Sequence, residues 1–213
     1  GSLFENTTAA GPVLALDPEG AAVTYTIVGG IDAARFSING TTGALSFVNA
    51  PNFENPTDAN GDNVYEVQVR ASDGALTATQ ARTVTVLNAN EAPAVVAPTS
   101  TVAAENQTAV MTVGVTDPDD GSTLTFSIVG GADAARFSIN SSTGVLTFVT
   151  APDFENPDDA DANGSYLVEV QVSDGALIGS QTIAVGLTDA NDAPVITGGG
   201  AVSVAENTAG AVA

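Results

Sequence analysis

Residues 90–190 contain short runs of apolar residues separated by turn-forming residues, which is typical of an all-β fold rather than of alternating strands and helices. The clearest run is 166–173, where apolar and polar residues alternate. Because successive side chains of a strand point to opposite faces, we expect one set to face a core. The inward set is Tyr166, Val168, Val170 and Val172, and the mostly outward set is Leu167, Glu169, Gln171 and Ser173. The matching run in the first half of the chain places Tyr65, Val67 and Val69 inward and Glu66, Gln68 and Arg70 outward.

Seven strands of this kind are predicted in the second half of the chain. They lie near 102–104, 110–116, 124–129, 137–139, 145–148, 166–173 and 180–187. Seven short strands within about a hundred residues indicate an immunoglobulin-like, Greek-key β-sandwich.

The sequence repeats itself with a period of about 101 residues: segment 33–39 recurs intact at 134–140, and a third copy begins at 202. We therefore predict tandem seven-stranded sandwiches, with repeat one at 1–89 and repeat two at 90–190. Residues 191–213 would form a linker and the first strand of an incomplete third repeat. The first strand of repeat one is expected to be truncated, since only Leu3 and Phe4 precede Glu5. Because Gly1-Ser2 resembles a cloning scar, we expect a piece of a longer protein.

Charge narrows the range of partners. The chain has 25 acidic residues against four arginines and no lysine, and its net charge is −21. This charge repels phosphate backbones, so nucleic acid and anionic membranes are unlikely partners, whereas cations are natural ones. The absence of cysteine and histidine excludes disulfides, zinc centres and histidine bases, and leaves oxygen ligands for a metal. Acidic repeats without lysine or cysteine fit an exported bacterial protein, and no signal peptide or membrane-spanning run is predicted.

Each repeat ends in a short polar linker, 88–93 and 189–194, that closes with a proline. Pro93 fixes its own φ and biases Ala92 toward an extended conformation, so we expect a straight linker. Side-chain oxygens of an extended segment point to both sides, where acidic loops of the flanking repeats can meet them. We interpret the linker as the central strip of a calcium site.

Four acidic motifs recur in each repeat. In repeat two they are Glu105-Asn106, 117–121, 153–155 and Asp174-Gly175. Any one of them alone is more typical of a β-turn than of a metal site, because turns select Asp, Asn, Pro and Gly. Together they fall at the ends of predicted strands where loops converge. Segment 159–164 and its counterpart 58–62 also resemble the opening of an EF-hand loop, but the downstream Glu and the flanking helices are missing, so an acidic turn is the preferred interpretation.

The combination resembles the cadherin repeat, specifically the cadherin-like domains of bacterial RTX-type surface adhesins. The resemblance covers nearly the whole chain and implies three Ca²⁺ ions at each junction between repeats. At junction one it implies the ligands Glu5, Asn52, Glu54, Asn88, Asn90, Glu91, the Ala92 carbonyl, Asp117, Asp119 and Asp174. At junction two it implies Glu105, Asp153, Glu155, Asp189, Asn191 and Asp192, with the remaining ligands beyond the end of the chain. Junction one departs from the family at Asn52, Asn88 and Glu91, where the family usually has Asp.

The sequence suggests three candidate functions. The first is a calcium-rigidified extender or adhesion segment of a large bacterial surface or secreted protein, with neighbouring repeats, another surface protein or a polysaccharide as partners. The second is a calcium-dependent carbohydrate-binding module, for which the three tyrosines offer no clear platform. The third, an enzyme, has only abundant carboxylates in its favour. The absence of Trp excludes adhesion by the Trp-anchored strand exchange of vertebrate cadherins and leaves other homophilic contacts open. Residues 201–205 match a first strand, so they are a candidate donor strand for the edge expected to be open in repeat one.

Overall fold

The computed structural model describes residues 1–119 and 121–195. It divides the chain into two compact units. The first unit holds Gly1–Val96, Gly114–Phe126 and Gln171–Ser180, and the second holds the remaining described residues. The predicted start of a third repeat, at 202, lies outside the described residues. Within the described ranges, no helix is long and apolar enough to span a membrane.

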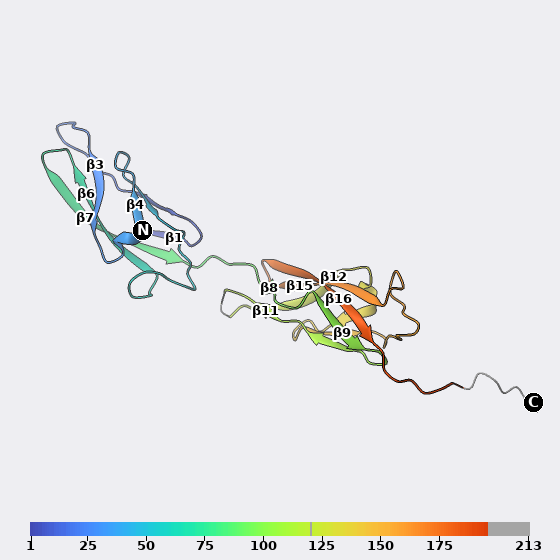
Figure 1. The fold of residues 1–213 in the computed structure, drawn as a ribbon. Helices are drawn as coiled ribbons and strands as arrows, with labels where there is room; N and C mark the ends of the chain where they lie inside the picture. The colour runs from blue at the N-terminus through green and yellow to red at the C-terminus, as the bar shows by residue number, and fades with distance from the viewer. Residues whose placement is uncertain (120, 196–213) are drawn as a thin grey trace, which may run out of the picture. The chain divides into compact units, whose positions relative to one another are not determined.

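Repeat one forms two facing sheets (Figure 1). The neighbours in the larger sheet are, in order, β1 (Ser2–Phe4), β7 (Thr77–Leu87), β6 (Val64–Ser72) and β3 (Thr24–Gly29). The smaller sheet contains β2 (Ala9–Pro12), β5 (Ala44–Phe47) and β4 (Phe36–Ile38). β1 is parallel to β7, and the other neighbouring strands of these two sheets are antiparallel.

Repeat two has the same two sheets. Its four-stranded sheet runs β12 (Thr125–Gly130), β15 (Ser165–Ser173), β16 (Ile178–Thr188) and β9 (Ser100–Ala104). Its three-stranded sheet runs β10 (Ala109–Thr112), β14 (Val145–Phe148) and β13 (Phe137–Ile139). The all-β, Greek-key prediction is therefore confirmed, and six of the seven predicted strands lie within two residues of the observed bounds.

The predicted strand at 110–116 is broken into two. β10 ends at Thr112, and β11 (Val115–Thr116) pairs instead with β8 (Ala94–Val95), which follows the linker. Gly114 separates the two halves: Val113 N donates to Gly144 O and Val96 N donates to Gly114 O, each at 2.9 Å. The chain changes hydrogen-bonding partner at this glycine, which periodicity alone does not reveal.

The predicted alternation of the sixth strand is confirmed. Tyr65 and Tyr166 are 0% exposed, and the valines on the same faces of β6 and β15 are at most 1% exposed. In repeat one Phe47 packs edge-on against Tyr65, with the ring centroids 4.9 Å apart. In repeat two Phe148 and Tyr166 make the same contact at 5.2 Å. Such aromatic contacts add about 0.5–1.5 kcal/mol beyond the buried area, so each core is fixed around its tyrosine.

The segments that resemble an EF-hand opening are turns, as the sequence interpretation preferred. The Asp159 carboxylate accepts hydrogen bonds from Asn163 N at 2.8 Å and from Gly164 N at 3.1 Å. Asp58 accepts the equivalent bonds from Asp62 N and Asn63 N at 2.9 and 3.3 Å. These carboxylates are committed to the backbone of their own loops.

The structure contains two short 3-10 helices that the sequence pattern did not predict. They are η1 (Ala33–Arg35) and η2 (Ala134–Arg136). Each follows a buried aspartate whose carboxylate bridges two backbone segments: Asp133 accepts hydrogen bonds from Ala160 N at 2.7 Å and Leu167 N at 2.8 Å. This aspartate therefore ties the helix to the acidic turn and to the start of β15.

The first strand of repeat one is more complete than predicted. Ser2, Leu3 and Phe4 pair with Thr85, Val86 and Leu87 of β7, and Gly1 O accepts a further bond from Thr85 N at 2.9 Å. The supposed scar residues form part of the strand because their backbone groups complete the ladder. β1 therefore occupies this stretch of the β7 edge that was expected to be open. The candidate donor strand, 201–205, lies outside the described residues.

Candidate metal centres

The first candidate centre is a trio of carboxylates, Glu5, Glu54 and Glu91. One oxygen of each lies within 4.8 Å of the others. Glu5 follows β1, Glu54 lies in the loop before β6, and Glu91 follows β7. All three belong to the first compact unit. The trio thus gathers residues that are far apart in the sequence.

Backbone hydrogen bonds fix the central member of this trio. Glu5 is 1% exposed, and its Oε2 accepts a bond from Phe53 N at 2.7 Å while its Oε1 accepts one from Ala89 N at 2.9 Å. Asn6 holds the linker member, because its Nδ2 donates to Glu91 Oε1 at 2.7 Å. Asn6 adopts φ 59°, a left-handed conformation that Asn tolerates better than most residues. The buried Glu5 therefore connects the linker to the loop that carries Glu54.

The charges in this trio are crowded. Burial raises the pKa of Glu54, and the nearby carboxylates of Glu5 and Glu91 raise it further, although a backbone hydrogen bond opposes them. A carboxyl whose pKa rises because of its neighbours is stabilised by a cation placed among them. The trio has the oxygen chemistry that Ca²⁺ prefers.

The second candidate centre consists of Glu105, Glu155 and Asp189, whose oxygens also lie within 4.8 Å of one another. It lies within the second compact unit. Glu105 is 1% exposed and accepts bonds from Phe154 N and Ala190 N, both at 2.7 Å. These two backbone bonds lower the pKa of Glu105 despite its burial. Its frame therefore matches that of Glu5.

Glu155 experiences the same crowding as Glu54. A backbone hydrogen bond lowers the pKa of Glu155, but burial and the charges of Glu105, Asp189 and Asp192 outweigh it, so the pKa is raised. Asn106 Nδ2 donates to Asp192 Oδ1 at 2.9 Å, as Asn6 does to Glu91. The role of these asparagines was missed in the sequence, although the Glu-Asn pair recurs in each copy, at 5–6, 105–106 and 206–207.

Further acidic groups surround the linker within the first compact unit. Asn90 Nδ2 donates to Asp174 Oδ2, and Glu91 N donates to Asp119 Oδ2, both at 2.7 Å. Asp119 N in turn donates to Asp117 Oδ1 at 3.0 Å. The predicted ligands Asn90, Asp117, Asp119 and Asp174 are thus joined by a chain of contacts to the linker.

Asp117 and Asp174 carry features that fit a cation. Asp117 Oδ2 is buried and has no hydrogen-bond partner among the described residues. A buried carboxylate oxygen without a partner is costly, and a metal ion satisfies it. The backbone N–H groups of Leu177 and Ala176, together with the Asn90 amide, lower the pKa of Asp174, so this side chain is available as a charged ligand.

Other predicted ligands are placed less directly. Asn52 Oδ1 accepts a bond from Asn55 N, and Asp153 Oδ1 accepts the equivalent bond from Asn156 N at 2.9 Å, so both begin turns. Asn191 is exposed, with Nδ2 3.5 Å from Asp192 O. Asn88 and Ala92 are exposed and flank, in sequence, the linker residues Ala89 and Glu91 that contact the buried frame.

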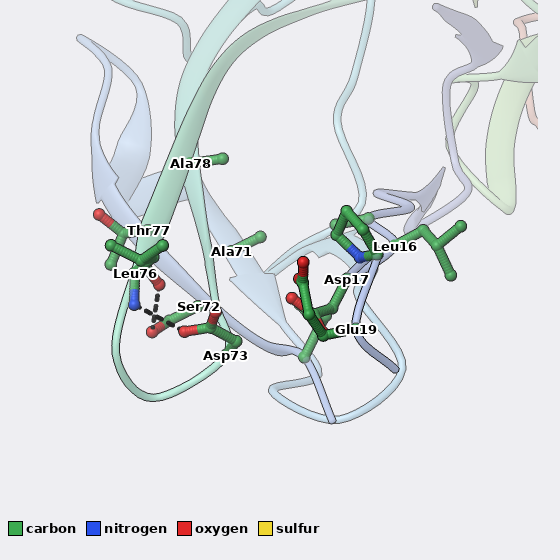
Figure 2. A pocket seen from close by; sticks show the side chains of 12 residues that line it. Leu16, Asp17, Glu19, Ala71, Ser72, Asp73, Leu76, Thr77 and Ala78 are labelled. Carbon is green, nitrogen blue, oxygen red and sulfur yellow. Dashed lines mark hydrogen bonds between the residues drawn. The ribbon is translucent and has the colours of Figure 1, made fainter. Parts of the chain in front are cut away.

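The leading end of repeat one carries the counterparts of Asp117, Asp119 and Asp174. These are Asp17, Glu19 and Asp73, which line a pocket of about 330 Å³ together with Leu16 and Leu76 (Figure 2). Asp73 Oδ1 accepts bonds from Ala75 N and Leu76 N at 2.7 and 2.6 Å. Leu16 is 91% exposed. The acidic residues of this pocket therefore lie beside exposed apolar side chains.

Residues 99–190 match the family model of the Cadherin domain. The second repeat is therefore a cadherin domain. The chain is 32% identical over 194 residues to Protocadherin-16 of Rattus norvegicus, which covers 84% of this chain and 6% of that protein. It is 47% identical over 51 residues to Halomucin of Haloquadratum walsbyi, which covers 22% of this chain and 1% of that protein. The chain thus spans a small part of the curated relatives it matches.

Solved structures show the same fold. The human Protocadherin-24 EC1-2 structure (form II) superposes with a TM-score of 0.59 at 19% identity, covering 90% of this chain and 94% of that one. The Drosophila N-cadherin EC1-4 structure gives a TM-score of 0.61 at 18% identity, covering 87% of this chain and 47% of that one. At these identities the likeness concerns the fold alone. Cadherin domains are extracellular adhesion modules that generally bind Ca²⁺, and the acidic clusters described above fit that property.

Proposed function

We propose that this chain is a calcium-binding segment of cadherin-like repeats, which acts as a rigid extender or adhesion segment in a large bacterial surface or secreted protein. The observation that carries the proposal is the hydrogen-bonded frame of each carboxylate trio. In the first trio Glu5 binds the linker backbone at Ala89 and the loop backbone at Phe53. An ion bound by the trio therefore joins the end of a repeat to its linker.

Electrostatics explain why calcium would rigidify such a segment. Two unit charges 4 Å apart repel by about 1 kcal/mol in water and about 4 kcal/mol at an effective dielectric constant of about 20. Glu5, Glu54 and Glu91 lie at about this separation. Without a cation the repulsion favours separation of the linker from the loop, whereas an ion among the carboxylates reverses the preference.

The ligand sets assigned by resemblance, with three ions per junction, are part of this proposal. The unpartnered oxygen of Asp117 and the contacts of Asn90 and Asp119 support a centre on the linker beside repeat two. The bacterial surface context rests on composition, since acidic repeats without lysine or cysteine suit an exported protein. The alternative of a calcium-dependent sugar module gains no support from the tyrosines, which are at most 7% exposed.

Isothermal titration with Ca²⁺ tests the binding, and small-angle X-ray scattering tests its mechanical effect. We expect saturable calcium binding, and we expect EGTA to leave both sandwiches folded by circular dichroism while broadening the distribution of end-to-end distances. Mg²⁺ at the same concentration is the control, because it requires a smaller and more regular oxygen cage. An identical scattering curve in calcium and in EGTA contradicts the rigid-extender role, and the absence of heat of binding contradicts the metal centres.

A further inference from the structure

Both repeats have an arginine at the end of the 3-10 helix, but only the arginine of repeat two forms an ion pair among the described residues. In repeat two Arg136, the last residue of η2, forms an ion pair with Asp158, with Nη1 and Oδ2 2.6 Å apart. In repeat one the equivalent arginine is Arg35, at the end of η1, and Thr57 stands in place of the aspartate. Among the described residues, Arg35 has no ion pair and no side-chain hydrogen bond. Arg35 is exposed, so its guanidinium is accessible to a ligand.

Arg35 lines a pocket of about 200 Å³. Its polar lining is Arg35, Asn49, Asn52, Asn55 and Thr57, and Pro51 is one of its apolar walls. The counterparts of Asn52 and Thr57 in repeat two are Asp153 and Asp158. Repeat one has therefore lost two negative charges around the same arginine. The lining of this pocket carries one positive charge and no negative charge.

Asn52 can donate into the pocket. Its Oδ1 already accepts a bond from Asn55 N, and no hydrogen bond uses its NH₂ group among the described residues. Arg35 adds up to five N–H donors in a planar fork, the geometry that binds a carboxylate with two parallel hydrogen bonds. Neutral side chains that both donate and accept, such as Asn49 and Thr57, suit the hydroxyl groups of a sugar.

We propose that this pocket binds a small carboxylate-bearing ligand, and that a sugar acid of the uronate class fits it best. The carboxylate pairs with Arg35, the hydroxyls meet the asparagines and Thr57, and the carbon skeleton lies against Pro51. Ligand pockets for drug-sized molecules measure about 300–1,000 Å³, so a pocket of about 200 Å³ accommodates a single sugar unit. The acidic surroundings disfavour a polyanion, so the ligand is one acidic unit or a chain end rather than the interior of a polyuronate.

The test is a titration of the full chain followed by amide NMR, with calcium in constant free excess. D-glucuronate is the probe, D-glucose is the neutral control, and an oligo-uronate distinguishes a free sugar acid from a polymer. We expect saturable shifts near Arg35 and Val48 with glucuronate, tenfold weaker or no binding of glucose, and no tighter binding of the oligomer per chain. Equal responses to glucose and glucuronate, or no saturable response, overturn the proposal.

Two variants locate the binding. Arg35→Gln removes the charge-assisted bonds and is expected to weaken binding at least tenfold. Thr57→Asp restores the residue found in repeat two, so it pairs with Arg35 and is expected to abolish binding while leaving the fold intact. Arg70→Gln, at an exposed position of β6, is the matched charge control. If Arg35→Gln and Arg70→Gln bind glucuronate alike, the pocket is not the site.

Self-association detected by light scattering and lost in Arg35→Gln would instead assign the arginine to a contact with acidic residues of a second copy. That result also overturns the proposal. Because Asn52 lines the pocket and is also a proposed ligand of junction one, calcium is titrated into the same protein without sugar. Normal calcium binding without a glucuronate response overturns the pocket and leaves the proposed function standing.

Discussion

The two carboxylate trios have equivalent residues at two positions and differ at the third. Each has a buried glutamate and a loop glutamate, Glu5 with Glu54 and Glu105 with Glu155. The linker member is Asp189 in the second trio, but its counterpart in the first is the neutral Asn88, and Glu91 completes that trio instead. In the first trio the linker carboxylate therefore comes from Glu91, three residues after Asn88. The hydrogen-bonded frame of a centre is thus fixed, whereas the linker carboxylate can come from either of two positions.

The leading ends of the repeats differ more strongly. In repeat two Gly114 and Gly179 border the segment after the linker: a Cβ on Gly179 would lie 2.1 Å from Pro93 O, and one on Gly114 would lie 3.2 Å from Val96 Cγ2. Repeat one has Leu14 and Ala78 at these positions, and Leu14 is 80% exposed. The glycines allow the linker backbone to approach the second repeat closely. Repeat one carries larger side chains at both of these positions.

The largest expected difference between the repeats concerns Gly179. Gly179→Ala places a methyl group against the backbone of Pro93, which can be relieved only by moving the linker, so we expect a loss of about 1–3 kcal/mol in the free energy of unfolding. The reverse change at the matched position, Ala78→Gly, is expected to cost less than about 1 kcal/mol. Urea unfolding of both variants measures the difference. Equal losses would show that the close approach at Gly179 has no energetic weight.

The next difference concerns calcium. Asp119 contacts the linker through Glu91 N, whereas its counterpart Glu19 is exposed and makes no contact with the 88–93 linker among the hydrogen bonds of the described residues. For an ion present at about ten times its dissociation constant, linkage gives about 1.4 kcal/mol of stabilisation. We expect Asp119→Ala to remove most of the calcium-induced rise in Tm and Glu19→Ala to leave that rise unchanged, as measured by calorimetry in calcium and in EGTA. Glu54→Ala should fall between them, because Glu5 and Glu91 remain. A calcium response that survives in Asp119→Ala contradicts the centre beside repeat two.

A smaller difference concerns the charge that the first linker lacks. Asn88→Asp supplies a carboxylate where the second linker has Asp189, so we expect calcium affinity to rise several-fold, because affinity depends on the number of charged ligands. Calcium titration of this variant, with Gln80→Glu at an exposed position of β7 as an equally acidic control, separates a local ligand from a general increase in negative charge. Equal gains from the two variants would mean that Asn88 lies outside the centre.

Much of the fold was predictable because periodicity reports burial directly. The alternation in β6 and β15 fixed the inward faces, and the recurrent Glu-Asn and Asp motifs pointed to the residues that form the trios. Two features of the fold were not predictable for physical reasons. The break at Gly114 depends on a change of hydrogen-bonding partner, and the 3-10 helices depend on the buried Asp32 and Asp133, whose bonding partners are distant in sequence.

The place of Glu91 in the first trio depends on the three-dimensional path of the linker. A position-by-position transfer from a family pattern assigns ligands by alignment and does not measure how far a side chain extends. The predicted ligand Asn52 likewise has a contact that alignment does not give, because its Oδ1 accepts a bond from Asn55 N. An amide oxygen has two lone pairs, so this bond is compatible with the proposed role of Asn52 as a ligand.

The smallest difference between the repeats is expected at the acidic turns 58–62 and 159–164, where the hydrogen bonds of the two repeats match. Burial alone would raise the pKa of Asp58, but hydrogen bonds from backbone groups, including Asp62 N and Asn63 N, outweigh it and lower the pKa below its ordinary 3.8. The pKa of Asp159 is lowered by the same balance. A lowered pKa in the folded state means that each carboxylate contributes stability at pH values above about 3.8, and that this contribution is lost as the pH falls through the folded-state value.

Asp58→Asn and Asp159→Asn should therefore each destabilise the chain at pH 7 by about 1 kcal/mol or more, because an amide replaces one acceptor oxygen by a donor facing an N–H group. The gap in stability between each variant and the parent should narrow as the pH falls from 5 to 3, measured by urea unfolding in EGTA so that calcium does not contribute. We expect the two gaps to be similar and to narrow in parallel. A gap that stays constant over this range would show that the charge of these aspartates does not stabilise the turns, and unequal gaps would show that the matching hydrogen bonds of the two repeats differ in strength.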